Sequence, residues 1–148
     1  MKIINKKANY NYVPQERYEA GIALSGKEVK AFRKGAVDLS SAYGKVINDE
    51  MYLVGANFSV DENPARSRKL LLHRKEIVSI LTKIKAKSLT LVPTKMYNKK
   101  RLIKLELALA KPKKQFSKKE SKKRADLDRE AERELRQDKM DFQKENRS

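Results

Sequence analysis

The side chains that most clearly predict a chemical task in this sequence are its lysines and arginines. The 148 residues include 36 Lys and Arg against 19 Asp and Glu, so the net charge is +17 with the single His neutral. Residues 111–124 concentrate this excess, with eight basic side chains and one acid, Glu120. Phosphate contacts dominate nucleic-acid affinity and need basic side chains in this number. The pattern predicts a nucleic-acid partner in preference to a general solubilising charge.

A second group of candidate side chains lies near the N-terminus. Asn5, Lys6 and Lys7 precede Tyr10 and Tyr12. Aromatic rings stack on bases and lysines hold phosphates, so this combination fits RNA binding. The alternative is a frayed end with the tyrosines packed on the barrel. We expect residues 1–9 as a whole to form a polar arm.

His73 and Glu19 are the two titratable residues that invite a more specific interpretation. His73 stands three residues before Glu76, where a helix N-cap belongs, so we expect a cap or an RNA contact rather than proton transfer. Glu19 lies beside Gly21 in a very basic protein, where it pairs with a cation or accepts from a base edge or ribose. A surface ion pair is the plainer alternative for Glu19.

The sequence lacks the residues that several functional classes require. There is no Cys, which excludes disulfides and thiol chemistry, and a single His disfavours a zinc site or a catalytic triad. No Gly-rich phosphate loop or metal-ligand spacing occurs in the sequence. We expect no enzyme, catalytic residue, metal or cofactor. No apolar run suits a membrane span or signal peptide, so we expect a cytoplasmic protein without a membrane partner.

Two helices are predicted in the body of the chain. Ser25 and Glu28 have the spacing of a capping box, which begins a helix over residues 27–34 that ends at Gly35. The second helix begins near His73. Its apolar face has the i, i+3, i+4, i+7 spacing of Ile77, Ile80, Leu81 and Ile84.

Short apolar runs between turn residues predict strands. The predicted strands cover residues 18–24, 42–47, 51–58, 89–93 and 102–109. Asn48, Asp49 and Glu50 form a hairpin turn between two of them, and residues 59–67 form a loop. Strands outnumber helices, so the predicted fold is mainly β: an OB-fold-like antiparallel β-barrel with flanking short helices and a basic C-terminal tail.

The composition changes after Ala110, which divides the chain into a barrel over 1–110 and a tail over 111–148. The tail has few sizeable apolar side chains: Phe116, Leu127, Leu135, Met140 and Phe142. These bury too little surface to offset the ordering entropy, so we expect a tail that is disordered when free. Leu127, Ala131 and Leu135 make a narrow helical stripe, and the tail is therefore expected to be helical when bound.

Taken together, short motifs along the body resemble those of the small protein B family, the SsrA-binding proteins of bacterial trans-translation. The matching stretches are Asn5-Lys6-Lys7-Ala8; Tyr12; Glu19-Ala20-Gly21-Ile22; Leu24, Gly26, Glu28-Val29-Lys30, Arg33 and Gly35; Gly55-Ala56-Asn57; Arg68-Lys69-Leu70-Leu71-Leu72-His73; Thr90-Leu91-Val92-Pro93 with Tyr97; and Lys104 with Leu107-Ala108. Each motif is weak alone, but their order across the body makes the resemblance specific.

The resemblance implies an OB-fold barrel that binds the tRNA-like domain of transfer-messenger RNA and carries it to stalled ribosomes. It also implies a tail that enters the empty messenger channel and folds into a helix beside the small-subunit decoding region. The implied RNA-binding residues are Asn5, Lys6, Lys7, Glu19, Leu71, His73 and Lys104. The implied ribosome-contacting tail residues are Lys111, Lys113, Lys114, Lys118 and Lys119.

Three departures from the family pattern bear on the tail and one loop. Pro112 stands where the family usually has Gly, which makes the junction stiffer because proline fixes φ and lacks a donor. Ser117-Lys118-Lys119 replaces Asp-Lys-Arg, which keeps most of the charge but loses a bidentate Arg contact. The loop before Arg66 is short for the family.

We expect a monomeric, non-enzymatic RNA-binding adaptor of trans-translation. The alternatives are a structural ribosomal protein, which would stay with ribosomal subunits through a high-salt wash, and a generic OB-fold RNA-binding protein. A nuclease is a further rival, and it would need acidic metal ligands.

Overall fold

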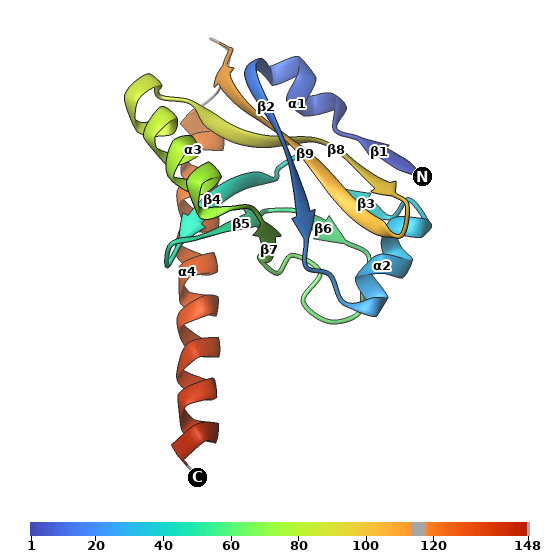
Figure 1. Ribbon diagram of the computed structural model, residues 1–148, viewed down its shortest axis with the longest axis vertical. Coiled ribbons are helices and arrows are strands. Elements are labelled where there is room, and N and C mark those ends of the chain that lie inside the picture. The colour runs from blue at the N-terminus through green and yellow to red at the C-terminus, as the bar shows by residue number, and fades with distance from the viewer. Residues whose placement is uncertain (114–117, 148) are drawn as a thin grey trace. The chain divides into compact units, whose positions relative to one another are not determined.

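A computed structural model describes residues 1–113 and 118–147 of the chain. The chain separates into two compact units, Met1–Phe116 and Ser117–Ser148, which are described one at a time. The first unit contains all the strands of the described residues (Figure 1).

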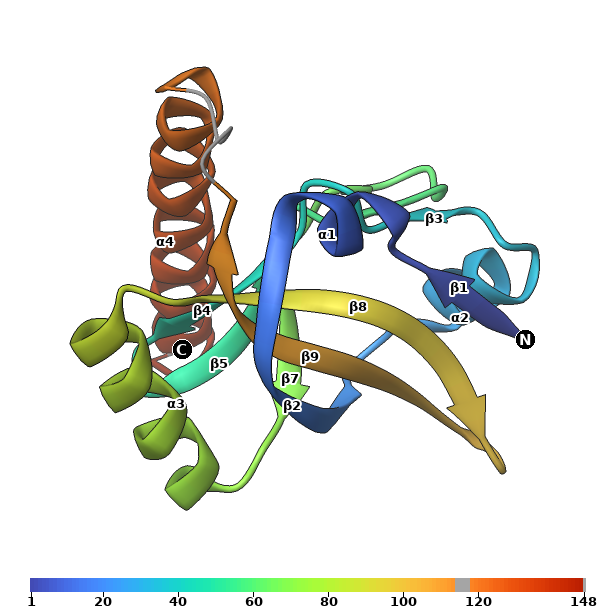
Figure 2. The same cartoon turned by 90° about the horizontal axis from the view of Figure 1, so that it is seen from above.

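The first unit is built on a ring of antiparallel strands. Its members are β2 (Tyr12–Ile22), β4 (Tyr43–Ile47), β5 (Glu50–Val54), β7 (Arg68–Leu71), β8 (Thr90–Lys99) and β9 (Leu102–Pro112). They pair in the order β8-β4-β5-β7-β2-β9, and β9 pairs back to β8, so the sheet closes on itself (Figure 2). This ring confirms the mainly β, OB-fold-like barrel predicted from the sequence.

Glycine permits the ring to close between β4 and β8. The two strands meet at one pair, Gly44 opposite Leu91. A Cβ atom at Gly44 would lie 2.5 Å from Leu91 Cδ2, and Leu91 is fully buried. Any larger residue at this position would push the strands apart or displace the leucine.

The core fills the inside of the ring. Ala20, Met51, Leu53, Leu105 and Leu107 are all almost completely buried, and they come from strands that are distant in the sequence. On β9 the larger side chains of opposite parity, Lys104 and Glu106, remain partly exposed, whereas the small Ala108 and Ala110 are buried. The parity of each strand therefore decides which side chains can meet a partner.

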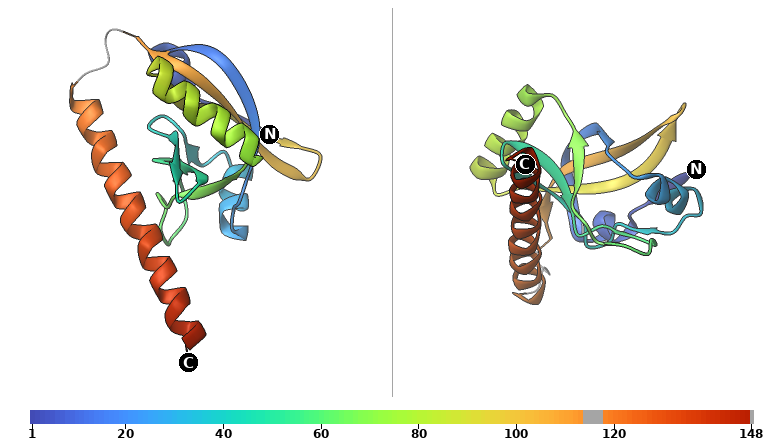
Figure 3. Two further views of the ribbon diagram at one scale, coloured as in Figure 1. Left: turned by 60° about the vertical axis from the view of Figure 1, so that its left-hand side comes forward. Right: turned by 90° about the horizontal axis from the view of Figure 1, so that it is seen from below.

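Both predicted helices are present. α2 (Gly26–Arg33) begins with the predicted capping box, because Ser25 Oγ accepts from the Glu28 amide and Glu28 Oε1 accepts from the Ser25 amide. It ends before Gly35, whose φ of 71° suits glycine. α3 (Arg74–Lys87) buries Ile77 and Ile80 in the core. Figure 3 shows this helix beside the ring of strands.

The polar arm expected over residues 1–9 is wrong. β1 (Lys2–Ile4) pairs with β8, and α1 (Lys6–Asn11) follows it directly. The buried Asn5 joins the two elements: its Oδ1 accepts from the Ala8 amide, and its Nδ2 donates to the carbonyls of Leu39 and Pro93 at 2.9 and 2.8 Å. A single short polar side chain thus fixes a segment that the sequence predicted as a polar arm.

The strand boundaries differ from the predicted ones in three places. β2 begins at Tyr12 rather than residue 18, and β8 continues to Lys99 rather than residue 93, because both extend along β9. The run over residues 51–58 is divided: β6 (Asn57–Phe58) leaves the ring and pairs with β3 (Val37–Asp38). The turn at Asn48 and Asp49 is confirmed, with φ of 52° and 64° at the two positions.

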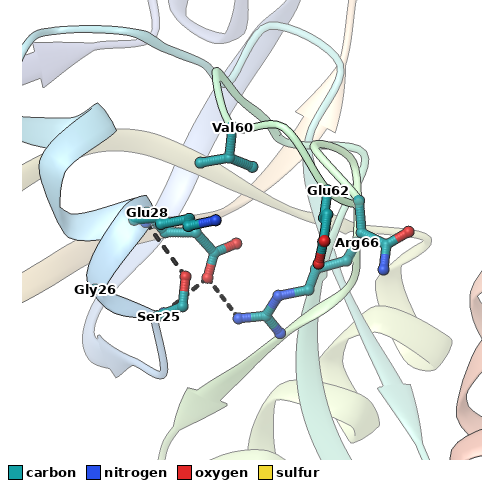
Figure 4. Close-up of a pocket in the computed structure, with 8 residues that line it drawn as sticks. Ser25, Gly26, Glu28, Val60, Glu62 and Arg66 are labelled. Carbon is teal, nitrogen blue, oxygen red and sulfur yellow. Dashed lines mark hydrogen bonds and ion pairs between the residues drawn. The ribbon is translucent and has the colours of Figure 1, made fainter.

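A buried ion pair joins α2 to the strand that follows the 59–67 loop. Arg68 Nε donates to Glu28 Oε2 at 2.6 Å, and both side chains are almost fully buried. Arg66 donates to the other carboxylate oxygen of Glu28 (Figure 4). The remaining Arg68 donors reach the carbonyls of Ala56, Pro64 and Arg66, and its guanidinium lies 4.1 Å from the Phe58 ring centroid. The arginine therefore orders the loop that leads into β7.

The second unit contains α4 (Lys118–Arg147), a helix of 30 residues and about 45 Å. Asp126 and Arg129 form an ion pair one turn apart, as their spacing allows. The first unit continues past the predicted boundary at Ala110, since β9 ends at Pro112 and the Lys113 amide donates to the Asn11 carbonyl at 2.9 Å.

The Glu28–Arg68 pair generates a stability prediction. Burial raises the pKa of Glu28, but the Ser25 amide, Arg66 and Arg68 outweigh it and hold this pKa below its usual value. Ionised Glu28 therefore stabilises the fold above the ordinary glutamate pKa, and this contribution is lost as the pH falls through the lowered value. We expect Glu28→Gln to cost about 3 kcal/mol at neutral pH, because Arg68 stays buried without its counter-charge.

Urea unfolding at pH 7 and pH 4 measures this cost. The exposed pair of Glu16 and Lys83 supplies the control, and Glu16→Gln should change stability far less. The double variant Glu28→Gln/Arg68→Met should recover part of the loss. Equal unfolding midpoints for Glu28→Gln and the unchanged protein would show that the pair does not hold the loop.

Candidate nucleic-acid interface

Five neighbouring strands carry one continuous outward surface, which we call the outer sheet face. Its residues are Lys2, Ile4, Arg17, Glu19, Gly21, Leu71, Lys95, Tyr97, Lys99, Lys104 and Glu106. The pairing registers align Lys2, Tyr97, Lys104, Gly21 and Leu71 as one row across β1, β8, β9, β2 and β7. A second row contains Ile4, Lys95, Glu106 and Glu19.

Leu71 and Lys104 flank Gly21 in the first row. Leu71 is an apolar side chain with 57% of its surface exposed, although its neighbour Leu70 is in the core. A Cβ atom at Gly21 would lie 3.2 Å from Leu71 Cδ1, so the glycine leaves room for the leucine to lie over β2. Lys104 is opposite Gly21 on the other side of β2. The exposed Leu71 side chain and the Lys104 cation thus lie on either side of the Gly21 backbone, which has no side chain to cover it.

Glu19 lies in the adjacent row, within a cluster of polar groups. The Tyr97 hydroxyl donates to Glu19 Oε2, and Lys99 Nζ lies 3.5 Å from Glu19 Oε1. The hydrogen bond from Tyr97 is the main cause that lowers the pKa of Glu19; burial opposes it, and the charges of Lys99 and Lys104 lower the pKa further. Burial and the bond to Glu19 raise the pKa of Tyr97 to about 12. At neutral pH, Glu19 is therefore an ionised acceptor, and Tyr97 is the neutral donor that holds it.

Glu106 organises the cations beside it. Its carboxylate accepts from Thr94 Oγ1 at 2.6 Å and lies 3.4 Å from Arg17 Nη1 and 3.9 Å from Lys95 Nζ. Lys95 also lies 5.6 Å from the Tyr97 ring centroid. The outer sheet face has five cations and two acids, so it keeps a positive balance while its acids hold individual cations in place.

His73 follows β7 and immediately precedes α3. Its backbone amide donates to Glu76 Oε1 at 3.2 Å, so His73 is at the N-cap position expected from the sequence. Its side chain is exposed, two residues beyond Leu71. Because His73 is exposed and follows β7, its imidazole can contact a partner at the edge of the outer sheet face.

The N-terminal candidates divide into a buried residue and two exposed ones. Asn5 is buried and engaged with protein groups, whereas Lys6 and Lys7 are exposed on the first turn of α1. Tyr12 is buried, and Tyr10 is 72% exposed with Lys113 Nζ 5.7 Å from its ring centroid. The structure therefore gathers Glu19, Leu71 and Lys104 on one face with His73 at its edge, while Lys6 and Lys7 lie on the separate helix that Asn5 fixes.

The tail candidates lie at or beyond the end of β9. Lys111 pairs opposite Val13, and Lys113 is exposed just after the strand. Lys114 lies outside the described residues. Lys118 and Lys119 begin α4, and only their backbone is described.

Sequence reasoning missed the polar groups that surround Glu19. Tyr97, Lys99 and Lys95 lie beyond residue 93, where the predicted strand stopped, so their parity with Lys104 was not visible. Glu106 lies within the predicted strand over residues 102–109 and was not singled out as a candidate. A longer strand over residues 90–99 would have placed Tyr97 and Lys99 on the same face as Lys95.

The described residues contain neither a metal-binding cluster nor a membrane-spanning helix. Across residues 1–113 and 118–147, no group of three or more Asp, Glu or His is arranged to hold a metal ion. None of the helices in that part of the chain is long and apolar enough to cross a membrane.

Comparison with known proteins gives consistent results. The family model described as SmpB protein matches residues 2–137. An SsrA-binding protein of Dehalococcoides mccartyi is 44% identical over 139 residues, which cover 89% of this chain and 81% of that protein. An SsrA-binding protein of Thermoanaerobacter pseudethanolicus is 42% identical over 146 residues, covering 93% of this chain and 94% of the relative.

A solved structure described as "tmRNA-SmpB: a journey to the center of the bacterial ribosome" contains a similar chain. The TM-score is 0.64 and the identity 39%, with 79% of this chain and 87% of that chain covered. The sequence motifs, the closed ring of strands and these matches over most of both chains lead to one conclusion: this chain belongs to the SmpB family.

Proposed function

We propose that this protein is an RNA-binding adaptor of trans-translation, which binds the tRNA-like domain of transfer-messenger RNA and delivers it to stalled ribosomes. The observation that carries the proposal is the gathering of Glu19, Leu71 and Lys104 on one basic sheet face, with His73 at its edge, in a member of the SmpB family. The names of the relatives and of the solved complex supply the RNA and the ribosome as partners.

The outer sheet face binds RNA through three kinds of contact. Its lysines and Arg17 meet phosphates, which supply most of the affinity. The exposed Leu71 side chain covers the apolar face of a base or sugar. His73, at the edge, donates or accepts a hydrogen bond or stacks on an unpaired base. Lys6 and Lys7 on α1 add phosphate contacts, and Asn5 contributes by fixing their helix.

Glu19 gives this surface an acceptor. A folded RNA offers 2′-hydroxyl groups and base amino groups as donors, and a carboxylate accepts from either. Since Tyr97, Lys99 and Lys104 keep its pKa low, Glu19 stays ionised in an environment where phosphates approach closely. Its role is to select donors of the RNA rather than to supply affinity.

The tail has a separate role on the ribosome. We assign ribosome contacts to Lys111, Lys113, Lys114, Lys118 and Lys119, and we expect the segment after β9 to be disordered in the free protein and helical in the messenger channel. The division of the chain into two units and the narrow stripe of Leu127, Ala131 and Leu135 support this proposal. Folding on binding makes recognition conditional, because only the correct channel repays the ordering entropy.

The mechanism is binding without chemistry. We propose a cytoplasmic, monomeric adaptor that is not an enzyme and whose action depends on holding an RNA in place on the ribosome. The basic charge of the whole chain supports rapid association with both RNA partners.

Removing one cation tests the outer sheet face. Lys104→Ala should weaken binding to a tRNA-like-domain transcript about tenfold at moderate salt, since it removes a charged contact at the centre of the face. The slope of log affinity against log salt should become shallower by about one, the change expected for one phosphate contact. Fluorescence titrations at several salt concentrations measure both quantities.

Lys85→Ala is the matched control, because Lys85 is exposed on α3 and belongs to neither row of the outer sheet face. It should change the affinity and the slope much less. If Lys104→Ala and Lys85→Ala have the same effect, RNA binding responds to total charge and the assignment of the face is wrong.

Truncation after Phe116 tests the tail, and it leaves β9 and its contact to Asn11 intact. The truncated protein should keep nearly full affinity for the tRNA-like domain but should not support tagging in a reconstituted stalled-ribosome reaction. Circular dichroism and thermal melting confirm that the barrel is folded. Loss of RNA affinity on truncation would contradict the division of roles.

A further inference from the structure

A cavity of about 580 Å³ lies beside the outer sheet face, and we call it the hairpin pocket. It is bounded by the β8–β9 turn, the end of β2 and one side of α2. In Figure 2 the β8–β9 hairpin extends beyond the ring on the side where β1 and α2 lie. The pocket therefore opens where the strands of the outer sheet face end.

The walls of the hairpin pocket are aliphatic. Ile22 comes from the end of β2 and Leu24 from the segment that follows it, Val29 from α2, and Leu102 and Ile103 from the start of β9. Leu102 is 63% exposed, which makes it one of the most exposed apolar side chains of the body. An apolar wall left open to water indicates a surface that a partner covers.

The mouth of the hairpin pocket is cationic. Arg33 at the end of α2 and Lys100 and Arg101 in the β8–β9 turn all line it, and none of its lining residues is acidic. Lys100 adopts the left-handed backbone conformation in this turn, with a φ of 58°. The pocket thus combines an apolar interior with two guanidinium groups and an ammonium group, a combination complementary to a flat apolar group attached to anions.

The hairpin pocket adjoins the outer sheet face at the hairpin tip. Leu102 lines the pocket, pairs with Lys99 of that face and has the same strand parity as Lys104, whereas Asn98 and Ile103 have the opposite parity and line the pocket from the other side of the hairpin. A polyanion that extends from Lys104 past Lys99 toward the hairpin tip therefore reaches the rim of the pocket at Leu102.

We propose that the hairpin pocket binds one unstacked nucleobase of the RNA held on the outer sheet face. The inference rests on the proposed function. Proteins read RNA mostly at loops and bulges, where bases turn outward and stack on aromatic rings or on arginine planes. Arg33 and Arg101 supply such planes, the aliphatic walls enclose the base, and Lys100 holds an adjacent phosphate. The cavity has the size of a small-ligand site.

We favour a base over an acidic peptide for two reasons. The mouth of the pocket is cationic, and the pocket adjoins the face proposed to hold the RNA. A peptide anchored by an apolar side chain would use the same walls, but the RNA proposed for the outer sheet face is already held next to the pocket, where Leu102 pairs with Lys99. The protein-ligand alternative becomes one of the outcomes of the test.

Paired substitutions at two exposed apolar residues test the proposal. Leu102→Asp and Leu102→Ser alter the pocket wall, and Val78→Asp and Val78→Ser make the same changes on α3, where Val78 is 54% exposed. Each pair changes the net charge equally, and neither position is in the core. The probe is a tRNA-like-domain transcript, with its base reactivity mapped by dimethyl sulfate and kethoxal in the presence of each protein.

We expect the unchanged protein to protect at least one unpaired base, and Leu102→Ser to restore its reactivity while protection by the outer sheet face persists. The affinity should fall about tenfold for Leu102→Asp, within the range for losing one stacked base. Both Val78 variants should behave as the unchanged protein. Melting temperatures confirm folding, and Arg101→Gln in the exposed turn offers an independent variant with the same expected loss of protection.

Three outcomes would overturn the inference. The first is a pattern of base protection by Leu102→Ser and Arg101→Gln that equals the pattern given by the unchanged protein. The second is an equal loss of affinity for Leu102→Asp and Val78→Asp, which would be a charge effect. The third is normal RNA binding combined with loss of ribosome association, which would assign the pocket to a protein ligand. Failure of the unchanged protein to bind the transcript would instead contradict the proposed function.

Discussion

Closure of the strand ring is the constraint on which the rest of the body depends. A closed antiparallel ring has only an inner and an outer surface, and the parity of each strand assigns every residue to one of them. Closure requires β4 and β8 to meet at Gly44 and Leu91, where a Cβ atom on residue 44 would push against the buried leucine side chain. It also requires β2 to lie between β7 and β9, which aligns Leu71, Gly21 and Lys104 in one row. The candidate interface is thus a direct consequence of the way the barrel closes.

The same closure explains why an arginine is buried in the body. Arg68 begins β7, and its parity directs it inward, away from the solvent that normally surrounds arginine. Glu28 supplies the counter-charge, and three backbone carbonyls occupy the remaining donors. The ion pair is therefore less a source of net stability than a device that fixes one path for the loop before β7. That path leads directly into β7, whose last residue, Leu71, pairs with Gly21 of β2.

The local features of the fold could be predicted from the sequence, and the long-range ones could not. The capping box at Ser25, the turn at Asn48 and the amphipathic helix after His73 depend on neighbouring residues, so pattern and spacing were sufficient. The extension of β8 to Lys99 depends on pairing with β9, and the order of residues 1–11 depends on Asn5 reaching Leu39 and Pro93. For the interface, family resemblance indicated Glu19, Leu71, His73 and Lys104. The contact of Glu19 with Tyr97 and Lys99 became visible only in the folded chain.

Site-specific photocrosslinking tests most directly the claim that the outer sheet face binds folded RNA. A photoreactive phenylalanine analogue would replace Leu71 in one variant and Asn48, in the exposed β4–β5 turn, in another. Irradiation with a tRNA-like-domain transcript should give strong crosslinking from position 71 and little from position 48. Crosslinking from position 48 that equals or exceeds that from position 71 would contradict the account.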